Sequence, residues 1–184
     1  MRRRFVAAVL AVLLAAPAYA KELAGVTMPD TLNAAGKRLL LNGLGLRKKA
    51  MFKVYVGGLY LEAPSHEPAA ILSSDQAKAV RMHFLRGLSK DQLTGAFKEG
   101  FEANAKEKAA GQKVSIDKFL AMLSDVKEGE ELTFTYVPGT GTTVSKGDSQ
   151  SGSIEGKDFA DVLFAVWLGP APPTEDIKKG MLGR

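Results

Sequence analysis

The sequence predicts an α+β fold in which helices cover one side of an antiparallel sheet. Segments with the twofold alternation of strands dominate residues 37–85, and segments with a helical period of three to four residues follow. The same order, strands and then helices, is repeated from residue 131 to the C-terminus. Runs of strands followed by runs of helices are typical of a sheet that buries one face under a helical layer, whereas doubly wound folds alternate strand and helix.

Three strands are expected in the N-terminal half, at residues 37–41, 51–61 and 79–85. Each is rich in apolar, β-branched and aromatic residues, and the third alternates most regularly. Segment 43–49 contains two glycines and three consecutive basic residues, and we interpret it as the connection of a long hairpin between the first two strands. A turn and a short helical stretch are expected within residues 64–76.

The middle of the chain predicts two helices. Ser89 and Gln92 have the spacing of a capping box. The apolar stripe that follows, interrupted by Gly95 and Gly100, recurs every three to four residues and indicates an amphipathic helix whose inner face carries Leu93, Phe97, Phe101 and Asn104. A second helix is expected to begin at Ser115, which has the chemistry of an N-cap.

The C-terminal part predicts a meander of strands and then two helices. Strands are expected at Glu131–Val137, 142–145 and 151–154, because tight Gly-containing turns separate three alternating runs. A strong helical stripe occupies residues 159–167 and stops at a Gly-Pro pair. Thr174 is predicted to cap a final short helix.

The first 20 residues have the organisation of a cleavable export signal. Three arginines precede an apolar run at residues 5–16, and small residues occupy positions 18 and 20. The run is shorter than the roughly 20 apolar residues of a membrane-spanning helix, which argues against an uncleaved anchor. We therefore expect residues 1–20 to be a signal peptide, cleaved after Ala20, and residues 21–184 to work as one domain in the periplasm or outside the cell.

Composition narrows the function classes further. The formal net charge is +5, and loss of the three leader arginines lowers it to +2, so a nucleic-acid partner is not expected. The chain has no cysteine and only two histidines, which predicts no metal site and no cofactor. After the leader no long apolar run follows, so no membrane span is expected in the mature chain. The residues give no indication of a partner protein or of an oligomeric state.

Few residues suggest chemistry. The sequence contains no G-x-S-x-G nucleophile elbow, no H-E-x-x-H pair and no P-loop. Arg47 stands out because it follows two glycines in the predicted hairpin connection, and a guanidinium can hold a carboxylate through two parallel hydrogen bonds. The residues alone leave a second interpretation open, in which Arg47 belongs to a solvated basic turn.

Two parts of the chain resemble the chalcone isomerase-like family. Residues 41–47, running on to 52–62, resemble the family's G-x-G-x-R plus "VYL" hairpin, and residues 145–147 and 154–157, which lead into the helix at 159–167, resemble the C-terminal half of its small bacterial members. The resemblance implies an open-faced β-sandwich, a long antiparallel sheet covered by a layer of helices. It also implies a cleft, which holds a flavonoid in the plant isomerases and a fatty acid in non-catalytic relatives.

The resemblance also assigns positions. Arg47 matches the family arginine, Tyr55 falls at the threonine position, Leu93 at the tyrosine position and Gly100 at the asparagine position. Leu93 and Gly100 have no side-chain donor, and an oxyanion is stabilised only by donors aimed at it.

We therefore expect a non-catalytic binder of a fatty acid or a similar apolar anion, with Arg47 and Tyr55 as its ligand-binding residues. The alternatives are an isomerase or intramolecular lyase that uses the same two residues on an unknown substrate, and a structural domain whose cleft is filled by its own side chains.

Overall fold

The computed structural model describes residues 21–184, so the predicted leader lies outside the described residues. A seven-stranded antiparallel sheet forms the body of the protein, and its spatial order β3 to β9 follows the chain. The strands are β3 (Thr31–Ala34), β4 (Lys37–Lys49), β5 (Phe52–Leu61), β6 (Lys78–Phe84), β7 (Glu131–Val137), β8 (Gly141–Lys146) and β9 (Ser149–Ile154). A separate hairpin contains β1 (Lys21–Leu23) and β2 (Val26–Met28). This antiparallel sheet confirms the predicted fold class.

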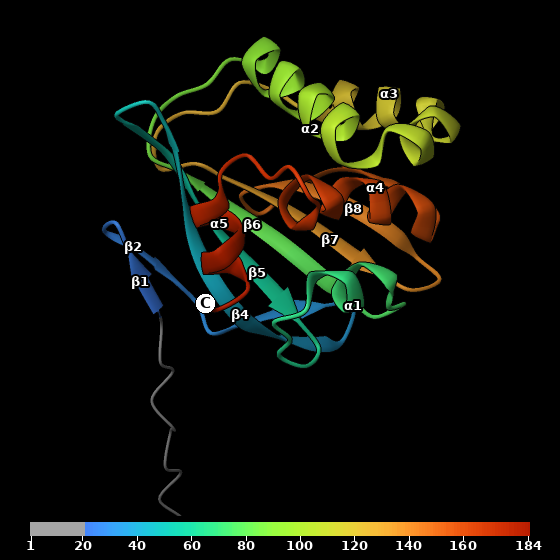
Figure 1. Cartoon of the computed structure of the whole chain (residues 1–184), viewed down its shortest axis with the longest axis horizontal. Coiled ribbons are helices and arrows are strands. Elements are labelled where there is room, and N and C mark those ends of the chain that lie inside the picture. The colour runs from blue at the N-terminus through green and yellow to red at the C-terminus, as the bar shows by residue number, and fades with distance from the viewer. Residues whose placement is uncertain (1–20) are drawn as a thin grey trace, which may run out of the picture.

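Five helices of the described chain accompany the sheet: α1 (Pro68–Ser73), α2 (Lys90–Gly111), α3 (Lys113–Met122), α4 (Lys157–Leu168) and α5 (Glu175–Met181). In Figure 1, α4 and α5 lie against the sheet, and α2 and α3 lie beyond α4. From Phe159 to Leu168 every residue of α4 except Asp161 is buried, because this helix is enclosed between the sheet and α2. A helix with apolar residues on all of its faces is typically buried in the core.

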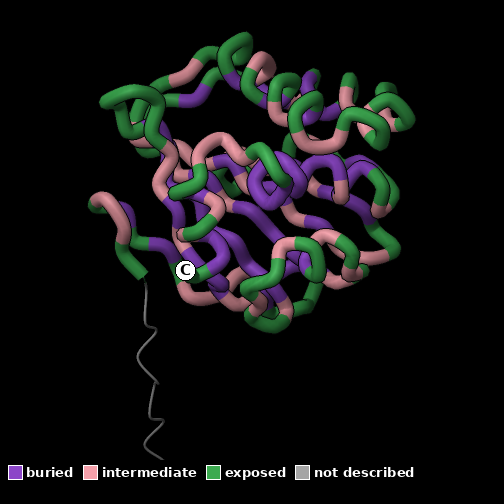
Figure 2. The backbone as a smooth tube through the Cα atoms, viewed as in Figure 1, coloured by how far each residue is buried: buried purple, intermediate pink, exposed green. Residues whose placement is uncertain are grey.

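The main core lies between the sheet and the helices. It contains a cluster of aromatic rings at edge-to-face and tilted angles, with centroids 4.9 to 6.0 Å apart, formed by Phe97, Phe101, Phe119, Phe134, Phe159 and Trp167. A smaller core on the other face packs the β1–β2 hairpin against Val56 and Tyr60 of β5. The helical layer thus covers one face of the sheet, and the β1–β2 hairpin covers part of the other. The buried residues follow the strands and α4, whereas α2 and α3 are largely exposed (Figure 2). This arrangement is the open-faced sandwich that the family resemblance implies.

The predicted hairpin connection at residues 43–49 is wrong, because this segment belongs to β4 and pairs with β5 throughout. The turn consists of Ala50 and Met51. The two glycines serve a different purpose: a Cβ on Gly43 or on Gly45 would overlap the backbone of α5. Glycine here permits a close approach between a helix and a strand. Because residues 43–49 belong to β4, Arg47 lies on a strand and not in a loop.

The helix starts are largely as expected. Ser89 Oγ accepts a hydrogen bond from the Gln92 N–H at 3.2 Å, and Gln92 Oε1 accepts one from the Ser89 N–H at 2.9 Å, which confirms the capping box of α2. Thr174 caps α5, as predicted. The predicted start of α3 at Ser115 is wrong, because the helix begins two residues earlier, at Lys113. Helix α2, which is kinked at Ala105, ends at Gly111, so a single residue separates the two helices.

Within the described residues, no helix is long and apolar enough to cross a membrane.

Candidate functional site

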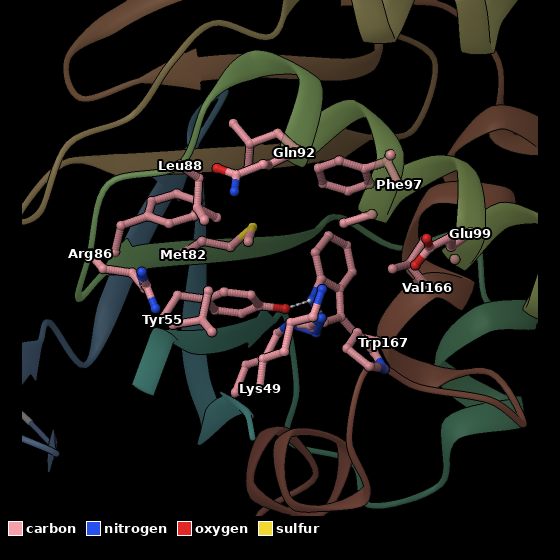
Figure 3. Close-up of a pocket in the computed structure, with 18 of the residues that line it drawn as sticks. Lys49, Tyr55, Met82, Arg86, Leu88, Gln92, Phe97, Glu99, Val166 and Trp167 are labelled. Carbon is pink, nitrogen blue, oxygen red and sulfur yellow. Dashed lines mark hydrogen bonds between the residues drawn. The ribbon is translucent and has the colours of Figure 1, made fainter. Parts of the chain in front are cut away.

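A cavity of about 670 Å³ lies between the helix-facing side of the sheet and helices α2 and α4 (Figure 3). Volumes of this size are typical of small-molecule sites. Its wall is mainly apolar: strands β5 and β6 contribute Val54, Met82 and Phe84, α2 contributes Leu93, Ala96 and Phe97, and α4 contributes Val166 and Trp167.

Arg47 and Tyr55 both line this cavity. They are direct cross-strand partners in the β4–β5 pairing, so their side chains project from the same face of the sheet. Arg47 is half-buried near the end of β4, two residues beyond the second of the glycines that lie under α5. Among the described residues, no carboxylate forms an ion pair with its guanidinium. The structure therefore brings the two predicted site residues together. Within residues 21–184, the Arg47 guanidinium has no carboxylate partner.

Tyr55 is held in place by Trp167. The indole N–H of Trp167 donates a hydrogen bond to the Tyr55 phenol oxygen at 3.0 Å, as the dashed line in Figure 3 shows. Tyr55 is only 5% exposed, and this burial raises the pKa of its phenol to about 12, although the Trp167 hydrogen bond and the charge of Arg47 oppose the rise. The phenol is therefore protonated at neutral pH, and its own hydrogen finds no acceptor within residues 21–184. That O–H remains available to a molecule in the cavity.

Leu93 and Gly100, the other two positions assigned by the resemblance, line the same cavity. Neither adds a polar group. A Cβ on Gly100 would lie 2.9 Å from Cγ1 of Val166, so glycine is required for α2 to pack closely on α4. Val166 is β-branched and cannot easily rotate away. The structure thus gives Gly100 a packing role.

The wall contains charged residues that the sequence did not single out. Lys49 and Arg86 add positive charge, and Asp91 and Glu99 of α2 add negative charge. The guanidinium of Arg86 lies 4.9 Å from the ring centroid of Phe52, within the range of a cation–π contact. In the described part of the chain, no cluster of three or more His, Asp or Glu side chains is placed to hold a metal ion.

Trp167 is a further site residue that the sequence did not single out, since the pattern predicts it only as part of an apolar helix stripe. A signal existed in principle, because a buried indole N–H needs an acceptor. The acceptor, however, comes from a strand 112 residues earlier in the chain.

The sheet, its helical layer and the cavity between them define the class of open-faced β-sandwich proteins with an internal cleft. The chain belongs to the chalcone isomerase-like family, whose sequence model matches residues 20–183. This match confirms the family that the hairpin and C-terminal motifs predict.

The structure is also similar to the crystal structure of a fatty-acid binding protein from Arabidopsis thaliana. The TM-score is 0.69 at 14% sequence identity, and the similarity covers 89% of this chain and 96% of that chain. At this identity the likeness shows the shared fold alone. No curated protein matches the sequence.

Proposed function

We propose that the protein is an exported, non-catalytic binder of a fatty acid or a similar amphipathic anion. The observation that carries the proposal is the pairing of half-buried Arg47 with buried Tyr55 in the wall of an apolar cavity. In this proposal the Arg47 guanidinium and the Tyr55 O–H donate to a carboxylate, and the hydrocarbon tail occupies the space along Leu93, Phe97 and Val166.

The cavity chemistry supports a carboxylate head and an apolar tail. An anion placed beside Arg47 gains a charge-assisted hydrogen bond, while each buried methylene of the tail contributes about 0.8 kcal/mol. A ligand without an acidic group would leave the guanidinium partly desolvated and unpaired, which is unfavourable. The name of the structurally similar plant protein, a fatty-acid binding protein, agrees with this ligand class.

The state of Tyr55 favours binding over catalysis. A general acid or base works best with a pKa near the operating pH, and burial moves the pKa of Tyr55 to about 12, away from neutrality. Leu93 and Gly100 offer no donor to an oxyanion. We therefore expect no chalcone cyclisation above background; an absorbance assay that finds turnover abolished by Arg47→Ala would instead support the isomerase alternative.

The direct test is to identify what the protein carries. The chain is expressed with its own residues 1–20 in a bacterial host, purified from the periplasmic fraction and extracted with organic solvent for mass spectrometry. The proposal expects free fatty acids at close to one per chain, and fewer in an Arg47→Ala preparation. An extract without any anionic lipid, together with no binding of added fatty acid, would favour the structural alternative.

The same preparation tests export. Intact-mass analysis should find a mature N-terminus at Lys21, in line with the small residues at positions 18 and 20. A periplasmic chain that still carries residues 1–20 would contradict the proposed cleavage.

A further inference from the structure

The tip of the β4–β5 hairpin carries an unusual pair of exposed apolar side chains. Met51 is 86% exposed and Phe52 is 56% exposed, and the only other large apolar side chain of the described residues that is comparably exposed is Val114. The tip projects from one end of the sheet, at the upper left of Figure 1, and its residues are exposed (Figure 2). Two adjacent apolar residues on a projecting tip indicate a contact surface.

The turn itself does not require these residues. A two-residue hairpin turn favours Asn or Gly, which accept a positive φ without strain. Here Ala50 takes a φ of 52°, and Met51 follows it with almost no protein contact. Neither turn geometry nor core packing explains a methionine at this position.

Basic residues surround the apolar tip. Lys48, Lys49 and Lys53 flank it in the hairpin, and Arg86 stacks on Phe52. Lys48 and Lys53 are direct cross-strand partners, an arrangement in which like charges destabilise the hairpin. No acidic residue occurs between positions 31 and 61. A negatively charged surface would relieve this repulsion.

We propose that the β4–β5 hairpin tip docks on the surface of an anionic phospholipid bilayer. Met51 and Phe52 enter the interface between head groups and acyl chains, and the three lysines contact the lipid phosphates. Apolar residues combined with flanking positive charge are the features by which peripheral segments bind anionic membranes. The inference goes beyond the proposed function and stands independently of it.

The hairpin tip adjoins the cavity. Lys49 and Phe52 belong both to the tip and to the cavity wall. Docking through the tip therefore places this exposed part of the cavity wall at the bilayer. Under the proposed function, an amphipathic ligand would then pass between bilayer and cavity without crossing water.

The test uses a dye that reports on one position at a time. Because the chain has no cysteine, Met51→Cys and Val114→Cys each give a single labelling site for a polarity-sensitive fluorophore. Val114 is the matched control, since it is 83% exposed on α3 and outside the hairpin. With vesicles of phosphatidylglycerol and phosphatidylcholine, we expect a blue shift at position 51 and none at position 114. A shift at neither position, or an equal shift at both, would overturn the proposal.

Charge variants test whether the lysines of the tip bind anionic lipid. Lys48→Gln combined with Lys53→Gln should weaken vesicle binding by about thirtyfold, because each lysine near an anionic surface contributes close to a factor of five. Lys106→Gln combined with Lys118→Gln removes the same charge from α2 and α3 and should change binding less than threefold. Equal losses in the two double variants, or an equal blue shift on pure phosphatidylcholine vesicles, would contradict an anionic docking surface. Fatty-acid titration without vesicles keeps this result separate from the proposed function, since neither Met51 nor the two exchanged lysines line the cavity.

Discussion

Trp167 donates its indole N–H to the phenol oxygen of Tyr55 at 3.0 Å, and this hydrogen bond links α4 to β5 in the wall of the cavity. Both side chains are almost fully buried. The bond fixes the orientation of the phenol, and the phenol hydrogen has no acceptor within residues 21–184. Tyr55 therefore has an observed structural contact and a proposed contact with the ligand, and a variant that lacks its hydroxyl tests both.

Tyr55→Phe should lower both stability and ligand affinity. The variant leaves the Trp167 N–H buried without an acceptor, which costs about 1–3 kcal/mol of unfolding free energy. It also removes the proposed donor to a carboxylate. Urea unfolding and calorimetric titration with a long-chain fatty acid measure the two effects.

Tyr136→Phe is the matched control for this variant. Tyr136 donates a 2.6 Å hydrogen bond to Asp75 away from the cavity, so its loss should affect stability but not ligand affinity. An equal loss of affinity in the two variants would refute the proposed contact of Tyr55 with the ligand.

Gly45→Ala should be severely destabilising. The added methyl would overlap the backbone of Ile177 in α5, and overpacking against a backbone typically costs about 1–3 kcal/mol or more. Gly95→Ala is the control. A Cβ there has no atom within 4 Å, and alanine in a helix is favoured over glycine by about 1 kcal/mol. We expect thermal unfolding to move in opposite directions for the two variants, and a Gly45→Ala protein as stable as the wild type would show that β4 and α5 are not in close contact.

The three tyrosines of the described chain should ionise late in an alkaline titration. Burial raises the pKa of Tyr55 and of Tyr60 to about 12, and burial together with Asp75 raises the pKa of Tyr136 as well. Since these values lie above the unfolded value of 10, their contribution to stability is complete below pH 10 and is lost as the pH rises towards 12. The slope is up to about 1.4 kcal/mol per pH unit for each tyrosine.

Ultraviolet absorbance of phenolate, followed together with circular dichroism, measures this behaviour. The chain that begins at Lys21 contains only these three tyrosines. We expect little phenolate at pH 10 and a steep rise that coincides with unfolding. Half-ionisation at pH 10 with an unchanged circular dichroism signal would show that the phenols are accessible to water.

Features set by neighbouring residues could be predicted from the sequence. The Ser89–Gln92 capping box, the Thr174 cap and the apolar face of α2 all depend on residues within a few positions of one another, and all three were predicted. The family resemblance added the open-faced sandwich and the choice of Arg47 and Tyr55 as candidate ligand-binding residues, but their direct pairing across β4 and β5 was not predicted.

Features set by distant packing could not be predicted in the same way. Gly45 was interpreted as part of a turn because glycine is common in turns, but its role depends on Ile177, which lies 132 residues later in the chain. The Tyr55 partner Trp167 is equally remote. Both contacts exist only once α4 and α5 have packed on the sheet.

The central claim, that Arg47 binds a carboxylate, is tested most directly by calorimetry with a long-chain fatty acid and the primary alcohol of equal length. A charge-assisted hydrogen bond contributes about 1.5–3 kcal/mol, so Arg47→Ala should weaken binding of the acid by about tenfold or more. The alcohol should bind nearly as before, because the apolar tail supplies most of its affinity. Lys49→Ala removes the same charge from an exposed part of the cavity wall and should weaken the acid much less. Equal losses for acid and alcohol in Arg47→Ala would contradict the claim and assign the arginine to support of the hairpin.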